Sequence, residues 1–94
     1  GKQWYVGTVE RLDGSTGDDG RRAGDVRLSV FLDEGESLRA RATLGPDAYA
    51  VAVAAHERGR AYVMFYAALH RGRRIGQFGP VEHFALIPEA APAR

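Results

Sequence analysis

Apolar and polar residues alternate along three stretches of the chain, and each alternation predicts a half-buried β-strand. The three strands cover residues 26–32, 38–44 and 62–69. The apolar side chains of a strand face the core, so the residues between them face outward. The outward residues of the first two strands are Arg27, Ser29, Phe31, Arg39, Arg41 and Thr43, and those of the third are Tyr62, Met64, Tyr66 and Ala68.

A turn rich in Glu and Gly joins the first two of these strands and predicts a hairpin. Because the apolar residues of both strands must reach one core, directly opposed residues share a face. A three-residue connection, residues 34–36, satisfies that condition. The register that follows pairs Val30 with Ala40 and Leu28 with Ala42 inside, and Phe31 with Arg39 and Ser29 with Arg41 outside.

Residues 4–12 are rich in aromatic and β-branched side chains and predict a strand at the start of the chain. Gly7 lies in the middle of this strand and predicts a β-bulge, which lets both Val6 and Val9 point inward. Residues 13–25 contain no large apolar residue and are rich in Gly and Asp. We therefore expect a long flexible loop there, solvated rather than holding a metal ion.

A single helix is predicted after residue 44. Pro46 suits the first helical position, Asp47 suits the positive N-terminal end, and Gly59 is the expected C-terminal stop. The residues that recur at helical spacing and form the expected apolar stripe are Tyr49, Ala52, Val53 and His56.

The chain closes with a basic turn and an interrupted strand. The turn, residues 70–74, carries one His and three Arg. The sheet resumes at residues 75–78, breaks at Pro80, which cannot donate a backbone hydrogen bond, and continues over residues 81–87. Phe84 and Leu86 are expected to point inward in this last stretch.

The predicted order is three strands, one helix and two strands, over residues 4–87. This order resembles the OB-fold, a five-stranded Greek-key barrel, and Gly7 resembles the mid-strand bulge that lets such a barrel close. The expected fold class is therefore mainly β, a five-stranded OB-like Greek-key barrel with one α-helix between strands three and four. An SH3-like or split barrel with a helical insertion is the competing fold.

The OB-fold resemblance implies a ligand face on the second and third strands. Two loops would flank that face, one after the first strand and one between the fourth and fifth. In this chain the flanking loops carry Arg21, Arg22, Arg71, Arg73 and Arg74. Residues 44–49 and 54–60 also resemble a pattern of small uncharacterised bacterial domains, often actinobacterial, which implies lineage and fold but no activity.

Length and composition fit one small domain, which we expect over residues 1–88 with a flexible Pro/Ala-rich tail over residues 89–94. The chain contains no cysteine, which excludes disulfides and thiolate metal sites and agrees with a cytoplasmic location. No apolar run approaches the ~20 residues of a membrane span, so no membrane partner is expected. The net charge is only +1, yet twelve of the thirteen basic residues are Arg, the better residue for phosphate contacts and aromatic stacking.

The outward face of the second and third strands combines arginines with an aromatic ring, as single-strand binders do. We therefore predict a non-enzymatic binding module for single-stranded DNA or RNA. The expected binding residues are Arg27, Phe31, Arg39, Arg41, Tyr62, Tyr66, Arg71, Arg73 and Arg74. The same arginines also fit an ordinary solvated sheet face whose long side chains cover apolar area.

A protein–protein module is the alternative, as an accessory domain of a larger bacterial protein or through self-association. The near-neutral charge and the outward stripe of Tyr62, Met64 and Tyr66 favour it. No catalytic pattern is present, because His56, His70 and His83 have no metal-ligand spacing and no serine has a recognisable partner acid and base. We expect no cofactor and no catalytic activity.

Overall fold

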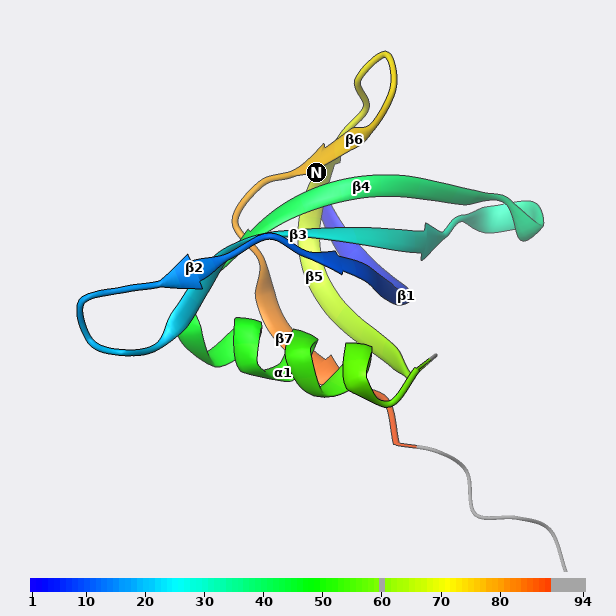
Figure 1. The fold of residues 1–94 in the computed structure, drawn as a ribbon. Coiled ribbons are helices and arrows are strands. Elements are labelled where there is room, and N and C mark those ends of the chain that lie inside the picture. The colour runs from blue at the N-terminus through cyan, green and yellow to red at the C-terminus, as the bar shows by residue number, and fades with distance from the viewer. Residues whose placement is uncertain (60, 89–94) are drawn as a thin grey trace, which may run out of the picture.

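The computed structural model describes residues 1–59 and 61–88 (Figure 1). The tail that we expected to be flexible, residues 89–94, lies outside the described residues, as does residue 60. The elements are β1 (Lys2–Leu12), β2 (Ser15–Thr16), β3 (Arg22–Phe31), a 3₁₀ turn (Asp33–Gly35), β4 (Ser37–Leu44), α1 (Pro46–Glu57), β5 (Tyr62–His70), β6 (Gly76–Phe78) and β7 (Glu82–Leu86).

The strands close into a five-stranded barrel in the order β1-β3-β4-β6-β5, with β5 returning to β1. Every pairing in this ring is antiparallel except that of β4 with β6, which is parallel. β7 continues the fifth barrel strand after the break at Pro80 and also pairs with β5. The predicted OB-like barrel with one helix is confirmed; the short β2, which the sequence did not predict, only shifts the strand count.

The core is built around Phe65 of β5. Its ring lies 4.9 Å from Phe78, 5.5 Å from Phe84 and 5.9 Å from Tyr5, measured between ring centroids. The helix α1 lies beneath the barrel (Figure 1) and packs against β1, β3 and β7. Aromatic packing and the helix together close one end of the barrel.

The helix begins at Pro46 and ends where Gly59 was expected to stop it. Gly59 adopts a φ of 76°, and its N–H donates to the carbonyl of His56. The buried face of the helix is Tyr49, Ala52 and Ala55. Our assignment of His56 to the apolar stripe was therefore wrong, because Ala55 takes the buried position and His56 is exposed.

Gly7 is not a bulge. Tyr5, Gly7 and Val9 alternate regularly and are buried, while Val6 points outward. The bulge of β1 lies between Val9 and Arg11, because Val9 pairs with Leu28 and Arg11 pairs with Arg27, only one residue further along β3. The prediction that both Val6 and Val9 point inward was wrong.

The β3–β4 hairpin has the predicted faces in a different register. Val30 pairs with Leu38 and Ser29 with Arg39, two residues away from the predicted partners. The connection is the 3₁₀ turn at Asp33–Gly35, closed by a hydrogen bond from the Leu32 N–H to the Glu36 carbonyl. Because a shift by two residues preserves the facing of every side chain, the core is unchanged.

The segment after β1 is not a structureless loop. β2 pairs with the first residues of β3, and a tight turn at residues 17–21 joins them, with the Gly17 N–H donating to the Arg21 carbonyl. The pair β2–β3 forms an arm that projects from the barrel beside the N-terminal end of α1 (Figure 1).

Candidate functional site

The outward side chains of β5, β1, β3 and β4 form one continuous surface, here called the outer face. The register shows how its rows cross the sheet: Tyr62 pairs with Thr8, Thr8 with Ser29, and Ser29 with Arg39. The outer face consists of Trp4, Val6, Thr8, Glu10, Arg11, Arg27, Ser29, Phe31, Arg39, Arg41, Tyr62, Met64 and Tyr66.

Aromatic side chains gather at one end of the outer face. The Phe31 and Tyr62 rings lie 5.7 Å apart at an interplanar angle of 70°, and the Trp4 and Tyr66 rings lie 5.3 Å apart. The exposed fractions are 53% for Trp4 and 47% for both Phe31 and Tyr62. Solvent therefore reaches about half of each of these three side chains. The structure brings together the predicted residues Phe31 and Tyr62, and it places the predicted Tyr66 against Trp4.

Trp4 belongs to this cluster although sequence reasoning did not assign it to the site. Its ring also stacks on His83 of β7 at 5.8 Å. The available signal was the alternation of β1 itself, which places Trp4, Val6 and Thr8 on one face once Gly7 is treated as an ordinary strand residue.

Arginines gather at the other end of the outer face. Arg27 lies between Arg11 of β1 and Arg41 of β4 in the sheet register. Arg11 forms an ion pair with Asp13 at 2.7 Å, and Arg39 lies 3.5 Å from Glu10. The Nε atom of Arg27 is buried and has no acceptor in the described part of the chain. The arginine row thus contains a guanidinium whose hydrogen-bonding capacity is not used within residues 1–59 and 61–88.

A groove separates the two ends of the outer face. It has a volume of about 530 Å³ and is lined by Thr8, Val9, Glu10, Phe31, Gly59 and Tyr62. The β1 bulge explains its chemistry, since a bulge places two consecutive side chains on the same side of a strand. Here Glu10 and Arg11 are both exposed, so a carboxylate stands beside the arginine row.

The basic turn between β5 and β6 lies near the aromatic end. Arg71 lines a second groove, of about 320 Å³, together with Trp4 and Phe31. Three acidic residues of the β3–β4 turn, Asp33, Glu34 and Glu36, line the same groove. Arg73 and Arg74 are exposed near the tip of the turn, which projects from the barrel (Figure 1). These three arginines therefore do not join the Arg27 row.

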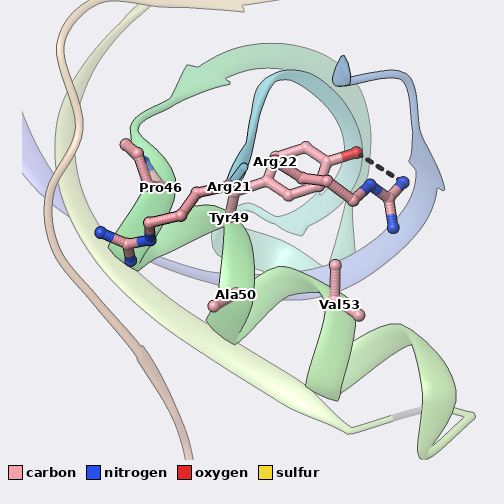
Figure 2. Close-up of a pocket in the computed structure, with 6 residues that line it drawn as sticks. All are labelled: Arg21, Arg22, Pro46, Tyr49, Ala50 and Val53. Atoms are coloured by element: carbon pink, nitrogen blue, oxygen red, sulfur yellow. Dashed lines mark hydrogen bonds between the residues drawn. The ribbon is translucent and has the colours of Figure 1, made fainter. Parts of the chain in front are cut away.

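Arg21 and Arg22 of the arm are held against the helix rather than beside the outer face. Arg21 donates to the Asp47 carboxylate, and this hydrogen bond raises the pKa of Arg21. The Arg22 guanidinium lies 5.2 Å from the centroid of the Tyr49 ring and donates to the Tyr49 hydroxyl at 3.3 Å (Figure 2). The expectation that this loop brings its arginines to the ligand face was wrong.

No protein-family model, curated protein or solved structure significantly matches this chain. Among the described residues, no helix is long and apolar enough to cross a membrane, and no three His, Cys, Asp or Glu side chains gather in a metal-binding arrangement. The outer face and the basic turn beside it therefore make up the candidate site.

Proposed function

We propose that this chain is a non-enzymatic module that binds single-stranded nucleic acid across the outer face. One observation carries the proposal: the exposed rings of Phe31 and Tyr62 share a continuous surface with Arg27, Arg39 and Arg41. Single-strand binders need both parts, because aromatic rings stack on bases of any sequence and cationic side chains follow the phosphates.

Two energy terms favour nucleic-acid binding over an outer face that only contacts water. Stacking of a base on an aromatic ring contributes about 1–3 kcal/mol, so two accessible platforms already support weak binding. Leaving a buried donor without an acceptor costs about 1–3 kcal/mol. The row of Arg11, Arg27 and Arg41 gains most from an anion, because neighbouring guanidiniums repel each other and Arg27 lacks an acceptor within the described residues. A phosphate over this row would relieve the repulsion, whereas the buried Arg27 Nε could donate to it only after the side chain moved.

The basic turn has a secondary part in the proposal. Arg71 lies beside Trp4 and would contact a phosphate next to a base stacked on that ring. The acidic side chains of Asp33, Glu34 and Glu36 weaken this end for a polyanion. We therefore assign the main phosphate contacts to the arginine row and weaker ones to Arg71, Arg73 and Arg74.

The first test is fluorescence anisotropy with labelled single-stranded DNA and RNA at several salt concentrations. We expect micromolar affinity that falls with a log–log slope of about −2, because each phosphate contact on a single strand contributes about −0.7. Binding that does not change with salt, or no binding at low salt, contradicts the proposal.

The second test compares two double variants with equal charge. Arg39→Ala with Arg41→Ala removes two positive charges from the outer face, and Arg73→Ala with Arg74→Ala removes two from the basic turn. We expect about tenfold weaker binding for the first variant and about twofold for the second, since Arg39 and Arg41 lie on the outer face itself, whereas Arg73 and Arg74 lie near the tip of a projecting turn. Equal losses would mean that net charge alone governs binding.

A protein partner is the second candidate, and the clustering of exposed rings favours it. The exposed large apolar side chains of the described residues, Trp4, Val6, Phe31 and Tyr62, all lie on the outer face. Contiguous apolar patches of this kind mark interaction surfaces. Sedimentation velocity distinguishes self-association from the monomer: a dimer that Phe31→Ser dissociates would support a protein interface.

A further inference from the structure

The groove between the two ends of the outer face has a chemistry of its own. Its walls include the rings of Phe31 and Tyr62, and its polar groups include the Thr8 hydroxyl and the Glu10 carboxylate. With about 530 Å³, it has the size of pockets that hold small organic groups. The Glu10 carboxylate repels the phosphates of a polyanion and can only accept hydrogen bonds. Its presence in the groove therefore favours a ligand group that donates hydrogen bonds.

The position of Glu10 is fixed from two sides. The regular alternation of β1, with Val9 buried, keeps Glu10 on the outward side of the strand, and the bulge between Val9 and Arg11 turns Arg11 to that side as well. Arg39 Nε lies 3.5 Å from Glu10 Oε2, which keeps the carboxylate oriented without a short hydrogen bond. No hydrogen bond engages the carboxylate oxygens of Glu10 within residues 1–59 and 61–88. Both oxygens can therefore accept from a ligand.

We propose that this groove binds a guanine base of the single strand, stacked on Phe31 or Tyr62, with its Watson–Crick edge on Glu10. A carboxylate offers two adjacent acceptors and no donor. Guanine is the base whose Watson–Crick edge presents two adjacent donors, N1–H and the exocyclic amine. Adenine and cytosine each place one amine beside a ring acceptor, which the carboxylate repels, and thymine places its N3–H between two carbonyl oxygens.

The geometry of the rings supports stacking of one base rather than two. The Phe31 and Tyr62 rings are 70° apart in plane, so a flat base covers the face of one ring and meets the edge of the other. Arg39 lies beside the groove, because Ser29 and Thr8 share a sheet row with it, and the row of Arg11, Arg27 and Arg41 is the next one along the sheet. The phosphate of the bound guanosine would point toward Arg41, while the edge of its base on Glu10 would lie beside Arg39.

This inference rests on the proposed function, and its test distinguishes the two. Anisotropy is measured with an oligothymidylate of about nine nucleotides, and with the same strand carrying one central dG, dA, dC or deoxyinosine. A bidentate contact to a base discriminates by about 5- to 150-fold, so we expect dG to bind about tenfold tighter than the others. Deoxyinosine lacks the exocyclic amine and should lose most of that gain.

The variant Glu10→Gln assigns the preference to this residue, because an amide offers only one acceptor. We expect it to bind all five strands within about twofold of one another, while the charge-matched Glu34→Gln variant keeps the dG preference. Equal binding of all strands by the unmodified protein overturns the guanine site and leaves the proposed function intact. A dG preference that survives Glu10→Gln, or that deoxyinosine retains, overturns the assignment to Glu10. Binding of none of the strands refutes both.

Discussion

Gly7 stands where β1 has a neighbouring strand on each side. Its backbone pairs with Val30 of β3 and with Val63 of β5 in the same stretch. A Cβ built at Gly7 would lie 2.3 Å from the carbonyl oxygen of Ser29, far inside van der Waals contact. Close approach of β1 and β3, rather than a left-handed backbone, therefore requires glycine at this position.

The Gly7→Ala variant should lose about 2–3 kcal/mol of unfolding free energy, because backbone atoms must move to admit the methyl group. Gly79→Ala is the matched control, since the nearest atoms to its Cβ lie 3.9 Å away and its backbone is not in the left-handed region. Urea unfolding measures both variants. Similar midpoints for the two would refute the steric account.

Tyr49 links the helix to the arm. Its fully buried side chain accepts hydrogen bonds through its hydroxyl from the Gly14 N–H at 2.9 Å and from Arg22 at 3.3 Å (Figure 2). Tyr49→Phe should destabilise the fold by about 1–2 kcal/mol, since the Gly14 N–H loses its acceptor. Tyr62→Phe removes an exposed hydroxyl and should have almost no effect on thermal stability. A Tyr49→Phe protein as stable as Tyr62→Phe would contradict this role.

Among the elements, β1 and β7 are joined at their first residues by an ion pair. Lys2 Nζ lies 2.6 Å from Glu82 Oε2 on the surface. The hydrogen bond from Lys2, followed by its positive charge, lowers the pKa of Glu82, and the same pair raises the pKa of Lys2. Glu82 and Lys2 are both fully charged, and therefore attract each other most, at pH values between the lowered pKa of Glu82 and the raised pKa of Lys2.

The pH dependence of this pair follows from the signs of the shifts. A carboxyl with a lowered pKa stabilises the fold above its unfolded pKa, and this contribution is lost as acid protonates it through the folded pKa. The lysine contribution is lost in strong base, as pH rises through its raised pKa. NMR titration should give Glu82 a pKa below the ordinary glutamate value, and Lys2→Met should bring it back up. An unchanged Glu82 pKa in that variant would mean that the pair does not form in solution.

The elements also show what the alternation of residues can predict. The outward residues of β3, β4 and β5 were predicted because a strand has period two, and burial of one face determines the other. The register of the β3–β4 hairpin was not predicted correctly, because a shift by two residues leaves every side chain on the same face of the sheet. The turn determines the register. Glu34 and Gly35 both have positive φ, of 66° and 79°, and the connection lies one residue earlier than the alternation of apolar residues predicted.

For the candidate site, too, the outward side chains could be predicted from the sequence, but the contacts between strands could not. Phe31 and Tyr62 were assigned to one surface, but their contact depends on β1 lying between β3 and β5, which is a tertiary fact. Trp4 was missed because a bulge was predicted at Gly7, and Arg11 joined the site only through the true position of the bulge, after Val9. Long-range pairing, rather than local preference, therefore determined the β1 part of the outer face.

At the scale of the whole molecule, the net charge of +1 limits nonspecific attraction to nucleic acid. Affinity must then come from local contacts, and the aromatic ones require bases that are not stacked in a duplex. We expect a blunt DNA duplex to bind at least about tenfold more weakly than either of its strands. Competition anisotropy at one salt concentration measures the ratio. Equal affinities would indicate phosphate contacts alone.

The barrel closes along a short seam. β4 and β6 pair through two residue pairs, Ala40 with Gly76 and Arg41 with Gln77. Opening of this seam breaks few hydrogen bonds, as does opening of the equally short β5–β6 pairing, so both are low-cost local openings of the ring. Arg41 belongs both to the seam and to the arginine row. A nucleic-acid strand bound across that row would therefore hold β4 in place against β6. The amide hydrogens of β6 would then exchange more slowly with ligand present, so the strand next to the outer face would report its occupancy.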